Sequence, residues 1–319
     1  MRDAPAVWDR IQLGQRIRSL LHDYFAAGLA AFAHLRNGGV TRAEARVILA
    51  LAPTPARAAV LTRGQLRAAL RRAGRVRHVD QDVERLHAIF RAAEWDISQV
   101  LSHLGSGAKI RRAALLASLG EGSKPERGDM EAIWATWNGM TRRQRADAFT
   151  RTAEDLVALY ESLDAPTREN LRLDVGLLPA PVDVATAARL LLSELALHSW
   201  DVRAGFDEHA TLTPGIAEHL LHQEPDLTGW IGKPDPLGGA KAVVAVTTSE
   251  PASVFALLLK DRISVDFDVP DEPDGTLTLP AEAWLRLVAG RLGPSHTPED
   301  VATTGAADLD LLRKVFPGY

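Results

Sequence analysis

Glu194 and His198 stand four residues apart in the run LLSELALHSWDVR, inside a stretch that is rich in alanine and leucine. On an α-helix, residues at this spacing project from one face about one turn apart, so the carboxylate and the imidazole would lie together. Such a pair suits a divalent metal, and a helical bundle then needs only one more ligand from a facing helix. His103, which lies beside an apolar helical face in the segment SHLG, is the candidate.

The same residues also have a simpler interpretation. A glutamate and a histidine four apart often form only a weak surface pair on a helix. A single histidine beside an apolar face is often a core residue with a satisfied ring. Spacing alone leaves the metal site and these alternatives open.

The chain contains no cysteine. This excludes disulfides, thiolate zinc ligands and a cysteine nucleophile. A metal must therefore bind through His, Asp or Glu, and any catalytic thiol must come from another molecule.

The charge is divided unevenly along the 319 residues, a length that suggests two or three units. Residues 1–92 contain 16 arginines, no lysine and seven acids, a net charge of +9, whereas the remainder carries −13. The arginines between 63 and 77 would suit phosphate contacts with nucleic acid, and the alternative is a solvated basic helix face. The longest apolar stretch near the start, 24–33, is too short for a membrane span, so we expect a cytoplasmic protein.

Hydrophobic periodicity predicts an α+β protein. We expect a short all-helical segment over 1–92, a helical bundle over 93–235 in which Trp134 and Trp137 anchor the core, and a small α+β domain over 236–319. The expected elements are helices over 142–163, 184–202, 280–292 and 307–316, and strands over 242–248, 254–259, 263–267 and 276–279.

Four segments together resemble the mycothiol-dependent maleylpyruvate isomerase family, whose bundle has the DinB fold. They occur in the family's order and span some 220 residues: WDISQVLSHLGSGAKI, LLSELALHSWDVR, TLTLPAEAWLRLVAGRL and DLDLLRKVFPGY. The resemblance implies a divalent metal, usually zinc in that family, bound by His103, Glu194 and His198. It also implies mycothiol as the thiol cofactor, whose metal-bound thiolate adds to a small unsaturated acid such as maleylpyruvate.

Carboxylates of such a substrate need a cation, and Arg291 is our candidate, with Arg286 second. For both, a surface arginine at a helix end is an equally good interpretation. The proposed partners are thus a small-molecule acid and mycothiol, with no membrane.

The stretch from about 21 to 90 resembles the helical connector of insertion-sequence transposases that join a RuvC-like nuclease domain to a serine recombinase domain. Neither catalytic domain is recognisable here, so the resemblance implies a gene fusion without transposase activity. It also leaves an alternative to the enzyme, an inactive fusion that carries a nucleic-acid-binding remnant. In this chain the transposase-like stretch stands where the family has its first bundle helix. Unless residues 79–92 substitute for that helix, an exposed apolar groove would favour a homodimer.

Overall fold

The computed structural model describes residues 61–80, 83, 97–176, 180–204, 207, 209–213, 215–221 and 225–318, with the backbone alone at 225–227. The chain divides into two compact units, Met1–Asp207 and Glu208–Tyr319. Most of the expected basic segment 1–92, and most of the substitute helix 79–92, lie outside the described residues.

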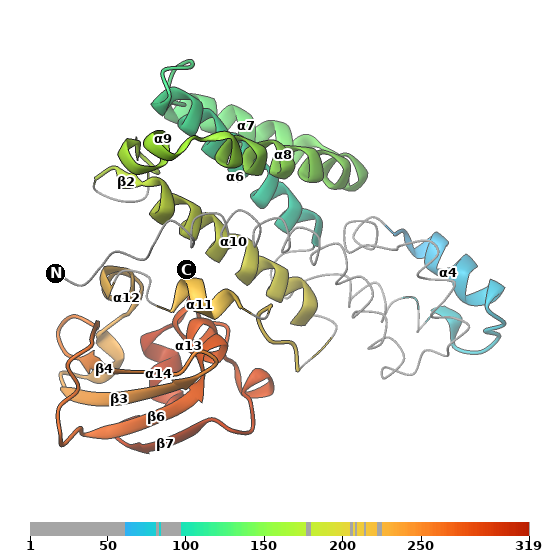
Figure 1. Cartoon of the computed structure of the whole chain (residues 1–319). Coiled ribbons are helices and arrows are strands. Elements are labelled where there is room, and N and C mark those ends of the chain that lie inside the picture. Colours follow the sequence, from blue (N-terminus) through green and yellow to red (C-terminus); the bar gives the residue numbers. More distant parts are fainter. Residues whose placement is uncertain are drawn as a thin grey trace. The chain divides into compact units, whose positions relative to one another are not determined.

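The first unit is helical in its described part, apart from one short strand pair (Figure 1). Its longer helices are α4 (Arg63–Arg72), α6 (Ile97–Ser118), α7 (Arg127–Gly139), α8 (Arg142–Ser162) and α10 (Val184–Ala204). The short helix α9 (Ala165–Asn170) precedes the antiparallel strands β1 (Arg172–Leu173) and β2 (Val182–Asp183).

Helix α6 is the central element of this unit, because it packs along α8 and also contacts α7 and α10. Its buried residues Leu101, Leu104, Ala108 and Leu115 recur at helical spacing and define the packing face. At Gly105 the approach of α7 is so close that a Cβ would lie 2.1 Å from the ring of Trp137. Glycine is therefore required where the two helices meet.

Local capping signals fix the starts of the helices that follow. Thr141 and Gln144 form a reciprocal capping box at the start of α8. Asp183 accepts a hydrogen bond from the backbone N–H of Thr186 at 2.6 Å, which caps α10. These caps set where α10 begins and hence which of its residues face α6.

The second unit is built on a five-stranded mixed sheet with the strand order β5-β4-β3-β6-β7. The strands β3 (Ala242–Ser249) and β6 (Gly275–Pro280) are parallel, and the other neighbouring pairs are antiparallel. The remaining elements are β4 (Ser253–Leu259), β5 (Ser264–Asp266), β7 (Ala302–Gly305), α11 (Ile216–Leu220), α12 (Pro225–Ile231), α13 (Ala281–Val288), α14 (Leu309–Val315) and the 3₁₀ turns η1 (Asp235–Leu237) and η2 (Pro294–His296).

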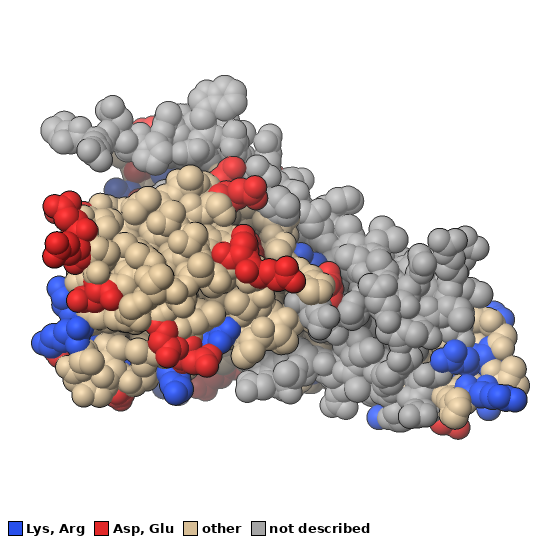
Figure 2. Space-filling model, turned by 90° about the horizontal axis from the view of Figure 1, so that it is seen from below, with Lys and Arg blue, Asp and Glu red and all other residues tan. Residues whose placement is uncertain are grey.

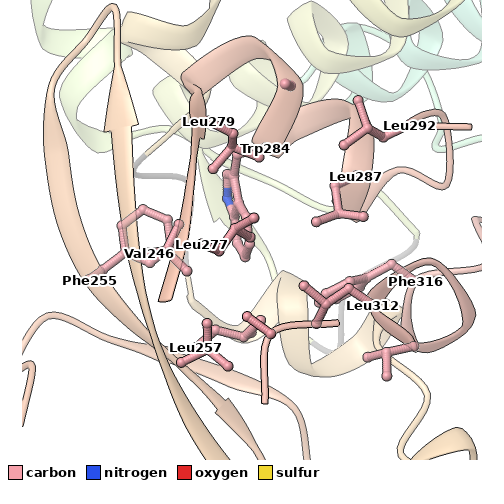
Figure 3. Close-up of a cluster of buried hydrophobic side chains, with 14 of the residues drawn as sticks. Val246, Phe255, Leu257, Leu277, Leu279, Trp284, Leu287, Leu292, Leu312 and Phe316 are labelled. Atoms are coloured by element: carbon pink, nitrogen blue, oxygen red, sulfur yellow. The ribbon is translucent and has the colours of Figure 1, made fainter. Parts of the chain in front are cut away.

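One face of the sheet carries the core of this unit (Figure 3). Val246, Phe255 and Leu277 lie on neighbouring strands and project toward Trp284 of α13 and Phe316. Trp284 makes edge-to-face contacts with both phenylalanine rings, at centroid separations of 5.0 and 6.2 Å. The period-two pattern of the strands is the signature of this one-sided burial.

The predicted α+β class is confirmed, with helices first and the sheet-containing unit second. The contacts divide the chain at 207/208, earlier than the boundary expected after residue 235. Ala217 and Leu221 belong to the hydrophobic core of the second unit, which explains the earlier start. None of the described helices combines the length and apolarity needed to cross a membrane.

Candidate metal centre

The structure brings His103 of α6 together with Glu194 and His198 of α10. His103 Nε2 lies 3.1 Å from Glu194 Oε2, and His198 Nε2 lies 3.8 Å from the same oxygen. One ligand atom from each residue lies within 4.8 Å of the other two, and no fourth His, Cys, Asp or Glu joins this group in the described part of the chain. Two distant segments therefore meet at one possible cation site.

These separations suit a small divalent cation. Bonds of about 2.1 Å at tetrahedral angles put neighbouring ligand atoms about 3.4 Å apart, and the two measured distances lie on either side of this value. The imidazole rings lie edge to face, with centroids 5.0 Å apart and an interplanar angle of 70°. Two imidazoles and one carboxylate form a donor set that zinc accepts, and three protein ligands leave a position for another molecule.

Asp201 orients His198 from the side opposite to the carboxylate of Glu194. Its Oδ2 lies 2.9 Å from His198 Nδ1, so Nδ1–H donates to Asp201 when the ring is neutral. This hydrogen bond leaves the lone pair on Nε2, the nitrogen nearer Glu194. A metal-binding histidine commonly has such a carboxylate partner.

Glu194 is held in its ionised form. Burial raises the pKa of this carboxyl, but the hydrogen bond with His103 and the positive charge of Arg111, with smaller contributions from His198 and His103, outweigh burial. The result is a pKa of about 2 instead of the ordinary 4.5. The carboxylate therefore stays negative, as a metal ligand must, down to strongly acidic pH.

The site opens on the His103 side. The side chain of His103 is 41% exposed, whereas those of Glu194 and His198 are 19% and 15% exposed. A small molecule could therefore reach the site without displacing core residues. Gly107 lies one turn from His103, and the guanidinium of Arg111 occupies the space beside it.

The two predicted carboxylate-binding arginines lie in the second unit. Arg291 follows α13, is half-buried, and donates to the carbonyl oxygen of Ala289 at 2.9 Å. Arg286 is buried, and its guanidinium donates to both carboxylate oxygens of Glu282 and to the carbonyl of His296. Arg286 is thus engaged in the fold, and the role of Arg291 stays a prediction.

The helical segment that holds the two-histidine, one-glutamate cluster is also the part of the chain that matches a family model. Residues 66–203 match the family model described as "Mycothiol maleylpyruvate isomerase N-terminal domain". This segment is similar to that domain family, and it contains all three clustered residues. The predicted resemblance to the isomerase family is confirmed over these residues.

Two solved structures align with most of the chain. The crystal structure of the mycothiol-dependent maleylpyruvate isomerase, and that of a histidine-to-alanine mutant of the same enzyme, each align with 90% of this chain and 95% of theirs. The sequence identity is 12% and the TM-score is 0.43 in both cases.

The transposase resemblance is confirmed over a limited length. A segment of 87 residues is 54% identical to the "Mini-circle putative transposase for IS117" of Streptomyces coelicolor. The match covers 27% of this chain and 21% of that protein, so the chain spans about a fifth of its curated relative.

Proposed function

We propose that this protein is a metal-dependent and thiol-dependent isomerase or transferase that acts on a small unsaturated acid, with mycothiol as the thiol. The observation that carries the proposal is the meeting of His103, Glu194 and His198 in a chain without cysteine. Thiol chemistry in such a chain needs an external thiol, and three protein ligands leave a coordination position for one.

The protein's own residues supply binding and orientation. His103 Nε2, a carboxylate oxygen of Glu194 and His198 Nε2 would hold the cation, for which zinc suits the donor set. Once bound, such a cation supplies Lewis acidity that favours the thiolate form of a thiol. Asp201 holds the ring of His198 in the required tautomer.

Arg291 is proposed as a further residue that binds a substrate carboxylate. It is half-buried at the end of α13, and its planar guanidinium suits two-point recognition of a carboxylate. Replacement by glutamine is expected to raise KM for the acid more than it lowers kcat.

The test of the proposed function is turnover of maleylpyruvate by the zinc-loaded full chain with and without mycothiol. Activity is expected only when zinc and the thiol are both present, and it is expected to be lost in Glu194→Gln. The exposed residue Glu154 gives a matched control, because Glu154→Gln makes the same chemical change on α8 away from the cluster. Full activity without the thiol would contradict the proposed function.

The alternative function is nucleic-acid binding through the basic N-terminal segment, as the partial transposase match favours. In its described part, Arg63, Arg67, Arg71 and Arg72 lie on α4, at the basic right-hand end of Figure 2. The other coloured part of that view combines a broad uncharged area with acidic and some basic side chains. A gel shift that weakens steeply as salt rises would support this function, and no shift at low salt would contradict it.

A further inference from the structure

Arg111 lies on α6 two turns beyond His103 and carries positive charge toward the candidate metal centre. Residues 103, 107 and 111 are spaced by four, so they share one face of the helix. Long side chains on a helix lean toward its N-terminus, which directs Arg111 back toward His103.

The position of the guanidinium confirms this direction. A Cβ at Gly107 would lie only 2.8 Å from Arg111 Nη1, so the guanidinium fills the space above Gly107. Gly107 itself is one helical turn from His103. The missing side chain at 107 is what lets the charge approach the cluster.

The charge of Arg111 also reaches α8, where it lowers the pKa of Tyr160 in opposition to burial. Within the described part of the chain, however, its guanidinium has no hydrogen bond or ion pair, although it is half-buried. A guanidinium in such a position has donors available for a ligand.

The balance of charge at the site favours an anionic ligand. A divalent cation, the carboxylates of Glu194 and Asp201 and two neutral imidazoles would sum to zero. Arg111 then leaves the site with a net charge of +1 and places a positive group beside the cation. Two adjacent positive centres repel each other, and an anion that bridges them removes this repulsion.

We propose that Arg111 binds a carboxylate of the small acid that occupies the candidate metal centre, through paired N–H donors. The inference rests on the proposed function and specifies its ligand as an acid whose carboxylate lies about one helical turn from the cation. Arg111 belongs to the same unit as the three clustered residues, and this distinguishes it from Arg291.

The experiment measures two affinities of the full chain by titration calorimetry: that of the metal-free protein for zinc, and that of the zinc-loaded protein for maleate, a small dicarboxylate. The variants are Arg111→Gln and, as the matched control, Arg112→Gln, which removes an exposed arginine from the same helix. Loss of a charge-assisted hydrogen bond is expected to weaken maleate binding about tenfold or more in Arg111→Gln. Arg112→Gln should bind maleate as the wild type does.

Zinc affinity provides the readout that separates ligand binding from structural damage. Removal of a positive charge near a cation site is expected to leave zinc binding unchanged or to strengthen it. Gly107→Ala keeps the charge but displaces the guanidinium, so weaker maleate binding is expected there too. If Arg111→Gln does not fold, Gly107→Ala is used for the test in its place.

Each other outcome has a definite meaning. If every variant binds zinc, and the wild type and Arg111→Gln bind maleate with equal affinity, the role of Arg111 is overturned and the metal site stands. The same loss in Arg112→Gln, or no maleate binding by the zinc-loaded wild type, also overturns it. Absence of zinc binding by the wild type refutes the proposed function itself, and this inference with it.

Discussion

Asp201 and His198 form a hydrogen-bonded pair within α10, with Oδ2 2.9 Å from Nδ1, and this pair fixes which nitrogen of His198 faces Glu194. In Asp201→Ala the ring loses this partner and becomes a less basic, less oriented ligand. Zinc affinity is therefore expected to fall by about 10- to 100-fold. Competition with a chromogenic zinc chelator measures the change.

The control for this prediction is Asp155→Ala, which removes an exposed aspartate from α8. It should leave zinc affinity unchanged. Equal affinities in Asp201→Ala and the wild type would show that the pair has no bearing on metal binding.

Zinc should also stabilise the folded protein, because the cluster joins α6 to α10. A ligand that binds only the folded state at a free concentration of 100 times Kd adds about 2.7 kcal/mol. Thermal unfolding of the wild type should therefore shift upward with zinc and return with a chelator. In Glu194→Gln the shift should vanish, and in Glu154→Gln it should persist; a zinc shift that survives in Glu194→Gln would point to another site.

Gly105 should be essential for the contact between α6 and α7. The Cβ of Gly105→Ala would overlap the buried ring of Trp137, so we expect a loss of about 1–3 kcal/mol in the free energy of unfolding. Gly128→Ala on α7 is the control, because its Cβ would meet nothing within 4 Å. Urea unfolding followed by circular dichroism distinguishes them, and equal stability of the two variants would refute the tight contact.

Because of Tyr160, we expect the free energy of unfolding to fall at high pH. Burial raises the pKa of its phenol from 10.0 to about 12, against a smaller opposing effect of Arg111. Between these values the unfolded chain loses this proton while the folded chain keeps it, so stability falls as pH rises, by up to about 3 kcal/mol. Below the lower value both states are protonated and the contribution is fully present.

Titration of tyrosinate absorbance tests this directly, because Tyr160→Phe should remove a phenol that ionises near pH 12. If the difference in absorbance between the wild type and Tyr160→Phe titrates near pH 10, the ordinary pKa of a phenol, the burial of this side chain is contradicted.

Much of the fold could be predicted where local signals and packing agree. The capping box at Thr141 predicts the start of α8, and the expected strand 242–248 corresponds to β3 (Ala242–Ser249) because its alternate residues are buried. The prediction that Trp134 anchors the core was wrong: it is 44% exposed, whereas Trp137 is buried. Only Trp137 faces Gly105, and the direction of α7 depends on tertiary packing that its sequence does not reveal.

In the candidate site, too, some residues could be predicted from the sequence and others could not. His103, Glu194 and His198 could be selected from helical spacing and family resemblance. Asp201 was missed, although its position three residues after His198 on the same helix face was a usable signal. Arg111 was missed because its importance depends on the empty space above Gly107 and on helices distant in sequence.

Metal analysis shows most directly whether one cation binds to His103, Glu194 and His198. Purified full chain, loaded with zinc, dialysed and analysed for metal, is expected to contain about one zinc per chain. His198→Ala and Glu194→Gln should contain almost none, and Asp155→Ala should equal the wild type. Zinc retained at the wild-type level in both cluster variants would contradict the metal centre.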